Sequence, residues 1–188
     1  MRFLDLKLID PPAALPVTVD EFIDHARING ITVDRQPDLI ERELTAATQR
    51  AEQYMRRSLI TQTLAAFYAP ENGARAPFII LPRGEVQSVS SIESGGSEVD
   101  AATYSIEWNI ITLTQSIAGA ATVEWISGYG DDAEDVPASI REGIYQYATT
   151  LYEDRTGERE SRYQATAGRT IPAGIVDLWR PFQIELGG

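Results

Sequence analysis

The sequence predicts an α+β fold in which a small antiparallel β unit lies between helical segments. Three observations predict it. Apolar residues recur at helical spacing before residue 58 and again after Pro137. Between these segments, six short stretches rich in branched and aromatic residues are separated by Gly, Pro, Asn or Asp, as strands are. The chain has 188 residues and no cysteine, and a domain of this size buries about 70% of its unfolded surface without disulfides.

The first residues predict an extended N-terminal arm, residues 1–17, because Pro11, Pro12 and Pro16 fix φ and remove backbone donors. The opening lacks the long apolar stretch of a signal peptide, and no run of 18 apolar residues follows. We therefore expect synthesis in a reducing cytosol and no membrane-spanning segment.

A capping box marks the start of the first helix. Thr18 and Glu21 have the required spacing, and Val17 and Phe22 have the spacing of a hydrophobic staple. This start predicts a short helix that runs to about Asn29.

The second helix is predicted over residues 38–57, completing a first helical part at 18–58. Its apolar stripe predicts core packing, with a subunit contact as the alternative. The stripe contains Leu39, Ile40, Leu44, Ala47, Ala51, Tyr54 and Met55.

The β unit is predicted over residues 59–136. Residues 93–100, ESGGSEVD, predict a hairpin connection, and Trp108-Asn109 predicts a tighter turn. The expected strands are QTLAAFY, FIIL, VQSVSSI, TYSIEW, IITL and ATVEWI.

Residues 137–188 predict the second helical part. Pro137 suits a first helical turn, where its missing N–H has no intrahelical partner, and the periodicity continues to about Arg155. Residues 156–170 are polar and weakly periodic, so they predict a mobile loop. A last short helix follows, which Pro181 ends or kinks. One face of it carries Ile175, Leu178 and Trp179, and Phe182 lies one turn further on.

The formal charge of −12 is concentrated in the middle of the chain. Residues 1–57 contain 8 basic and 10 acidic residues, residues 58–136 contain 2 and 11, and residues 137–188 contain 6 and 7. DNA binding works by Lys and Arg displacing counterions from phosphates. The middle segment is therefore expected to repel DNA.

The residue pattern predicts no catalytic, cofactor or metal site. His25 is the only histidine, and there is no cysteine to share a metal or a proton with it, so a structural role is expected for it. Residues 128–133, GYGDDA, match a dinucleotide fingerprint only loosely, because no helix is expected to open there. A hydrolase with paired carboxylates remains an alternative, since eleven acids in one segment always offer some pair.

Two charged clusters are candidates for interaction. The acidic loop lacks the alternating ligands and central glycine of a calcium loop, so it is expected to be solvated; it contains Asp131, Asp132, Glu134 and Asp135. The arginine cluster is expected either to be solvated or to pair with an acidic partner or a neighbouring subunit. It contains Arg155, Arg159, Arg162 and Arg169.

The order and spacing of five stretches resemble the head–tail connector proteins of tailed phages, also called adaptors or head-completion proteins. These are AEQYMRRSLITQT at 51–63, LPRGEVQSVSSI at 81–92, VEWISGYG at 123–130, VPASI at 136–140 and LYEDR at 151–155. The resemblance covers the chain from about Val17 onward. Each stretch is a packing or turn motif rather than an active-site motif.

The resemblance implies a four-helix connector core with the small antiparallel β unit inserted between the second and third helices. It also implies a non-enzymatic ring of about twelve copies below the portal protein of a phage or phage-like particle made in the bacterial cytoplasm. The ring would extend the DNA channel toward the tail without binding DNA specifically. No cofactor is implied, and the partners are the portal ring, other copies of the chain and a stopper or tail-completion protein.

Two surfaces of this connector are expected to be functional. The C-terminal segment is expected to dock on the portal through Ile175, Leu178, Trp179, Arg180 and Phe182, with core packing as the alternative for the aromatic pair. Part of the acidic segment, including the acidic loop, is expected to face the DNA channel. The alternative functions are a stopper or tail-completion protein of the same particle, or a carboxylate-pair glycan hydrolase.

Overall fold

The structure is a computed structural model that describes residues 1–26, 37–71, 75–153 and 170–184. The chain forms two compact units. Unit 1 comprises Met1–Ala13, Arg56–Asp131 and Ile184–Gly188, and unit 2 comprises Ala14–Met55 and Asp132–Gln183. Among the described residues, every strand belongs to unit 1 and every α-helix to unit 2.

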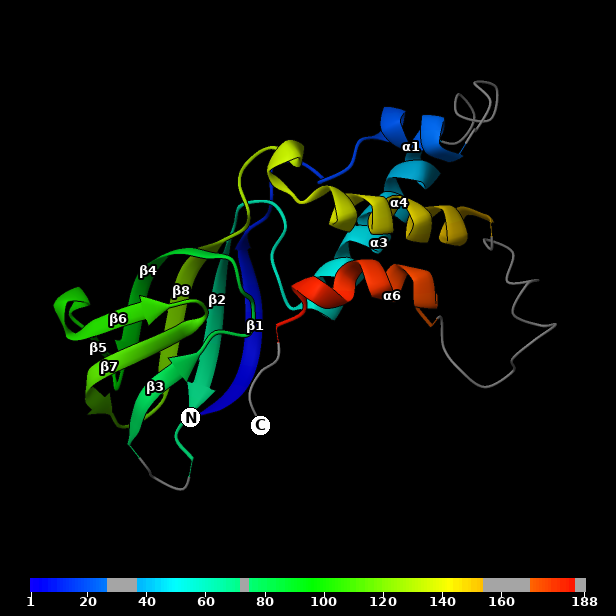
Figure 1. The fold of residues 1–188 in the computed structure, drawn as a ribbon. Helices are drawn as coiled ribbons and strands as arrows, with labels where there is room; N and C mark the ends of the chain where they lie inside the picture. Colours follow the sequence, from blue (N-terminus) through cyan, green and yellow to red (C-terminus); the bar gives the residue numbers. More distant parts are fainter. Residues whose placement is uncertain (27–36, 72–74, 154–169, 185–188) are drawn as a thin grey trace. The chain divides into compact units, whose positions relative to one another are not determined.

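A five-stranded antiparallel sheet forms one layer of unit 1 (Figure 1). Its order is β1 (Arg2–Asp10), β2 (Gln62–Ala69), β8 (Ala121–Ser127), β4 (Val86–Ser94) and β5 (Ser97–Glu98). Strand β1 therefore lies at one edge of this sheet and pairs with β2 alone among the described strands.

A three-stranded antiparallel sheet forms the second layer of unit 1. Its order is β3 (Ala76–Ile80), β7 (Ile110–Ile117) and β6 (Tyr104–Glu107), and the 3-10 turn η1 (Ala101–Thr103) precedes β6. Side chains from both sheets share one core, because alternate residues of each strand point inward. Fully buried members include Ile79, Ile92, Ile111, Val123 and Trp125.

The predicted strands and turns of the β unit are confirmed. Each of the six expected stretches forms a strand. Gly95 and Gly96 adopt positive φ between β4 and β5, as a tight hairpin requires. Trp108 adopts φ 59° in the turn between β6 and β7.

Unit 2 contains four α-helices in its described residues. Helix α4 (Ala138–Glu153) packs against α3 (Pro37–Met55), α6 (Ala173–Trp179) and α1 (Val19–Ala26) (Figure 1). Two 3-10 turns flank this set, η2 (Ala133–Asp135) before α4 and η3 (Arg180–Phe182) after α6.

The predicted start of the first helix is confirmed. The Glu21 N–H donates to Thr18 Oγ1 at 3.2 Å, and the Thr18 N–H donates to Glu21 Oε2 at 3.3 Å, which completes the capping box. Val17 and Phe22 are both buried, as the hydrophobic staple predicts. The expected end at Asn29 lies outside the described residues.

The other helix predictions have mixed outcomes. The expected apolar stripe of the second helix packs in the core, where Ile40, Leu44 and Met55 are fully buried. The predicted helix after Pro137 is α4, and its expected last residue, Arg155, lies outside the described residues. So does almost all of the predicted loop at 156–170. Pro181 ends the last α-helix, as expected, because the chain continues there as the 3-10 turn η3.

The prediction of a four-helix core with a small inserted β unit is wrong. Strand β1 precedes every helix and pairs along β2, so the β unit is not an insertion between the second and third helices. Two sheets account for most of unit 1 and dominate the fold. The prediction of an extended N-terminal arm rested on prolines that lie after the strand. Pro11 and Pro12 end β1, whereas residues 2–10 contain no proline and so retain every backbone donor.

Candidate functional site

Three of the stretches that resemble connector proteins meet in unit 1. The Gly84 N–H donates to the Arg56 carbonyl at 3.0 Å, and the Gly128 N–H donates to the Glu85 carbonyl at 2.9 Å. A Cβ on Gly128 would lie 2.5 Å from the Thr61 nitrogen, so only glycine fits there. These three stretches therefore specify a junction of turns in unit 1.

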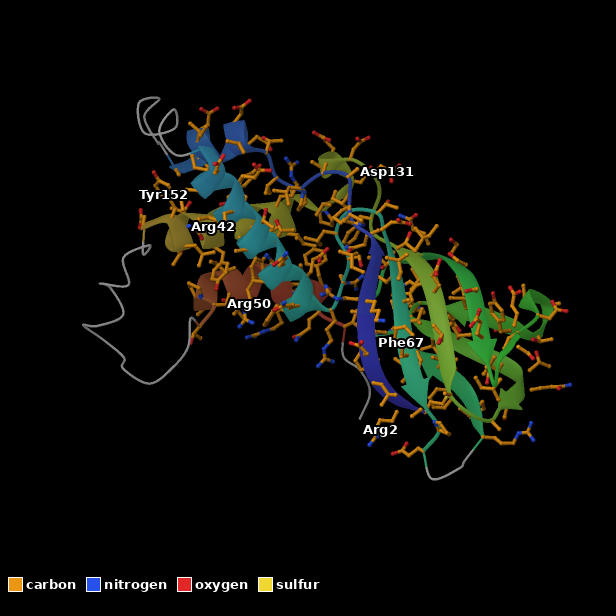
Figure 2. All side chains as sticks on the ribbon, turned by 180° about the vertical axis from the view of Figure 1, so that it is seen from behind. Arg2, Arg42, Arg50, Phe67, Asp131 and Tyr152 are labelled. Carbon is orange, nitrogen blue, oxygen red and sulfur yellow. The ribbon has the colours of Figure 1, made fainter. Side chains whose placement is uncertain are left out.

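The acidic loop follows β8, and its four carboxylates are all exposed (Figure 2, where Asp131 is labelled). Asp132 and Asp135 form a capping box for η2, since the Asp132 N–H donates to Asp135 Oδ2 at 3.2 Å. Asp131 and Glu134 take no part in this cap. All four carboxylates are thus accessible to solvent, but only Asp132 and Asp135 have a structural role in the η2 cap.

The hairpin of β4 and β5 adds further negative charge to unit 1. Glu93 lies directly opposite Glu98 in the antiparallel pair, and like charges in this position are destabilising. Asp100, just beyond, accepts a hydrogen bond from the Ala102 N–H at 2.9 Å. The acids of the middle segment therefore lie on separate elements, with Glu93, Glu98 and Asp131 in unit 1 and the rest of the acidic loop in unit 2.

The predicted docking segment divides into buried and exposed residues. Ile175 and Trp179 are buried in unit 2, and Trp179 Nε1 donates to the Ile140 carbonyl at 3.2 Å. Leu178 and Phe182 are half-buried and Arg180 is exposed. The buried pair therefore packs in the core, and the accessible part of the segment is Arg180 with its half-buried neighbours.

A hydrogen-bonded cluster joins α1 to α4, and sequence reasoning found only its capping box. Tyr145 Oη donates to Glu21 Oε2 at 2.5 Å, and Arg141 Nη2 lies 2.7 Å from Glu21 Oε1. The Tyr145 hydrogen bond, assisted by Thr18 and Arg141, lowers the pKa of Glu21 to about 2 against the effect of burial. Burial and the same hydrogen bond raise the pKa of Tyr145 to about 12. The predicted structural role of His25 fits this cluster, since its ring stacks on Tyr145 with 5.5 Å between ring centroids.

Two grooves of unit 1 lie beside exposed apolar residues. The first, of about 540 Å³, is lined by Trp108, which is 82% exposed, and by Ile184, whose side chain contacts Gly84. The second, of about 390 Å³, lies between β1 and β3 and is lined by Phe3 and Phe78. Among the described residues that line them, neither groove holds two carboxylates.

The glycan-hydrolase alternative needs an acid pair in a concave site. In the described lining of the two grooves, the only carboxylate is Glu85, and it forms an ion pair with Arg57. A hollow along α3 does hold two acids, Asp38 and Glu41, but both are exposed to solvent rather than enclosed in a cleft. The pKa of Glu21 is strongly shifted but lowered, whereas a general acid requires a raised pKa. These sites therefore give the hydrolase interpretation no support.

The predicted arginine cluster lies outside the described residues. Within the described ranges, no three His, Asp or Glu side chains come together in a way that could hold a metal ion. The helices of the described part are too short or too polar to cross a membrane.

The surface that sequence reasoning missed is strand β1. Phe3, Leu4, Leu8 and Ile9 are all exposed on it. The missed signal was the segment RFLDLKLID itself, in which apolar and charged residues are interspersed over nine positions without a proline.

Comparison with known proteins reports on the fold. No family model matches the chain, and neither does any curated protein. Three solved chains each match 98% of this chain and 99% of their own length. They come from the neck of an empty GTA particle with C6 symmetry (TM-score 0.71, 19% identity), the virion of the native gene transfer agent (GTA) particle (0.74, 17%) and the neck of the native GTA particle with C12 symmetry (0.68, 17%). At these identities the similarity establishes that this chain has the fold of those particle components.

Proposed function

We propose that this chain is a structural, non-enzymatic subunit of the neck of a phage or phage-like particle. One observation carries the proposal: the fold matches chains from GTA necks and a GTA virion over almost the full length of both partners. Both units are included in that match, so the likeness is not confined to a common small module. Fold alone does not specify function, and the packing and turn motifs of the sequence supply the second support.

Within the neck, we assign the chain to the adaptor position. The neck of one neighbour was described with C12 symmetry and that of another with C6 symmetry. A closed ring of about twelve copies below the portal is consistent with such cyclic symmetry. The ring would then meet a stopper or tail-completion protein on its far side, at the head–tail interface of a particle made in the bacterial cytoplasm.

The docking surface for the portal is assigned to the accessible part of the C-terminal segment. Arg180 is exposed and offers a planar guanidinium that pairs bidentately with carboxylates. Leu178 and Phe182 flank it, half-buried. Trp179 and Ile175 are buried in unit 2. They position the docking segment but do not contact the portal themselves.

The charge distribution favours DNA passage without DNA binding. The exposed acids of the acidic loop and of the β4–β5 hairpin repel phosphates, and few basic residues accompany them in the middle segment. A channel wall of this kind lets a duplex slide. We assign Asp131 and Glu134 to that wall, because neither is engaged in the η2 cap.

The test is the native mass of the portal ring, encoded by the same genome, after incubation with the purified chain. A gain of about twelve copies is expected for an adaptor. If the portal gains no mass, the adaptor assignment is wrong. Binding only to a portal that already carries another neck protein would instead identify a stopper or tail-completion protein.

A further inference from the structure

Strand β1 is an exposed apolar edge. The exposed fractions of Phe3, Leu4, Leu8 and Ile9 are 45%, 53%, 52% and 46%. Among the described strands, β1 has β2 on one side and no strand on the other, as Figure 2 also shows. A nine-residue edge with four exposed large apolar residues is a template for pairing with another chain.

The charges of β1 are self-complementary. If two copies of β1 run antiparallel with Leu6 opposite Leu6, then Asp5 of each copy lies opposite Lys7 of the other. Arg2 likewise lies opposite Asp10. Every charged residue of the strand thus meets an opposite charge, and opposite charges in directly facing positions stabilise an antiparallel pair.

The apolar residues of β1 match in the same register. Phe3 of one copy lies opposite Ile9 of the other, and Leu4 lies opposite Leu8. The pair would bring these four exposed residues of each copy beside those of the other and bury part of their surface. No apolar residue of the strand faces a charged one.

The two faces of β1 agree with this register. Asp5 and Lys7 face the same side as their β2 partners, and Lys7 Nζ lies 5.0 Å from the ring centroid of Phe67 on that side. Leu6 faces the core side, where its partner Ala66 is buried. Directly opposed residues of an antiparallel pair share a face, so the charged pairs would extend one face of the sheet and the Leu6 pair the other.

The centre of β1 is the regular part of the strand. Its irregularities against β2 fall between Phe3 and Asp5 and between Leu8 and Asp10. The central contacts of the proposed pair, Asp5 with Lys7 and Leu6 with Leu6, therefore lie between the two bulges. The Leu6 N–H donates to Asp5 Oδ1 at 2.9 Å. In the proposed pair, a backbone carbonyl of the second strand would accept this hydrogen bond instead.

We propose that β1 pairs with β1 of a second copy about a two-fold axis, which joins the two five-stranded sheets across the molecules. The Leu6 amide exchanges its acceptor, and the Asp5 carboxylate becomes free to pair with Lys7 of the second copy. Such an isologous contact closes on itself. It is a state of the free chain, distinct from the head-to-tail contacts of a ring, and it does not depend on the neck proposal.

The test is a charge-swap series on the full-length chain, with mass measured by sedimentation equilibrium. The wild-type chain is expected at twice the 20.8 kDa monomer at micromolar concentration. Asp5→Lys and Lys7→Asp each create two facing like-charge pairs in the dimer, so each is expected to raise the dissociation constant about tenfold or more. The double variant Asp5→Lys/Lys7→Asp has the wild-type composition and is expected to dimerise again.

Mixing provides a stricter version of the test. The two single variants are each expected to be monomeric, but an equimolar mixture is expected to form a mixed dimer. The first variant carries lysine at both positions and the second carries aspartate at both, so every facing pair of the mixed dimer joins a lysine to an aspartate. Asp24→Lys, an exposed reversal in α1, is the control that leaves the dimer intact.

Cross-linking tests the register itself. Leu6→Cys is expected to form a disulfide-linked dimer on oxidation, because the native chain has no cysteine to compete. Hydrogen-bonded partners in an antiparallel pair place their Cα atoms about 5.5 Å apart, which is within the range of a disulfide. The same change at an exposed site of α1, Asp24→Cys, should give no efficient cross-link.

Two outcomes would overturn the proposal. A wild-type chain that stays monomeric up to high micromolar concentration has no such contact. Oligomers that persist in both single variants, or that the double variant and the mixture fail to restore, would mean that the copies do not meet through paired β1 strands. Coincident far-UV circular dichroism spectra of the wild type and the variants show that any loss of dimer is not a loss of folding.

Discussion

At the scale of single residues, Glu21 shows how one side chain serves two structural purposes. Its backbone and carboxylate complete the capping box with Thr18, and the same carboxylate receives the Tyr145 hydroxyl and the Arg141 guanidinium. The capping box is local in sequence, whereas the other two partners come from α4. Glu21 therefore fixes both the start of α1 and its contact with α4.

Glu21 should make the stability of the helical unit depend on pH. Its pKa of about 2 in the folded chain lies below the ordinary 4.5, so the contribution is present above about pH 4.5 and is lost as the pH falls toward 2. Glu21→Gln keeps a capping-box residue but removes the charge. We expect the Tm difference between wild type and variant to shrink from pH 7 to about pH 3 in thermal unfolding followed by circular dichroism.

The matched control is Asp20→Asn, which removes a neighbouring exposed carboxylate of the same helical turn. Its Tm difference from the wild type should change less over the same pH range. A Glu21→Gln difference that stays constant with pH would contradict the ionic role of this carboxylate.

Gly128 should tolerate no side chain. It has φ +147°, and a Cβ would lie 2.5 Å from the Thr61 nitrogen and 2.6 Å from the Ile60 carbonyl carbon. Because both are backbone atoms, Gly128→Ala is expected to lower the free energy of unfolding of unit 1 by about 2 kcal/mol or more, measured in urea. Gly174→Ala, where a Cβ meets open space within α6, should not destabilise unit 2.

At the scale of elements, α6 is held to α4 by a close approach of an indole to a glycine. A Cβ on Gly143 would overlap Trp179 Nε1, so the absence of a side chain creates the space that the ring occupies. The Tyr54 and Tyr147 rings flank the indole, each with its centroid 6.1 Å away. The last helix thus depends on Trp179 for its position.

Substitutions at the adjacent residues Trp179 and Arg180 should distinguish an effect on folding from an effect on docking. Trp179→Ala removes a fully buried aromatic residue and is expected to lower the free energy of unfolding by about 3–5 kcal/mol. Arg180→Glu should leave Tm nearly unchanged but abolish binding to the portal ring in the native-mass measurement. Arg50→Glu, an exposed reversal on α3, is the control for binding. Unchanged portal loading by Arg180→Glu would remove the docking role from this segment.

The elements that the sequence predicted well are those specified by neighbouring residues. Thr18 with Glu21, the glycines at 95 and 96, and Pro181 each determine the backbone within a few positions, and each prediction is confirmed. The pairing of β1 could not be predicted, because its partner β2 begins only at Gln62 and a local segment does not specify a partner at such a separation. The burial of Trp179 was open for the same reason, since Gly143 and Ile140 belong to another helix.

At the scale of the whole molecule, charge is the property that most clearly relates the chain to its proposed task. The net charge of −12 is carried mainly by residues 58–136, which form the greater part of unit 1. Facing like charges such as Glu93 and Glu98 reduce stability. Under the proposed function, their presence on a hairpin reflects a requirement for a negative surface.

Reversing the charge of the two loop acids that take no part in the η2 cap tests that requirement in an assembled particle. Asp131→Lys/Glu134→Lys leaves the η2 cap of Asp132 and Asp135 in place, so folding and ring assembly should be normal. Two new cations per copy would attract phosphates, and about twelve copies would multiply the effect, so we expect DNA delivery to fall about tenfold or more at low salt and to recover as salt is raised. The control reverses Asp20 and Asp24, two exposed acids of α1, and should deliver DNA normally. Normal delivery by the loop variant in fully assembled particles would mean that this loop does not line the channel.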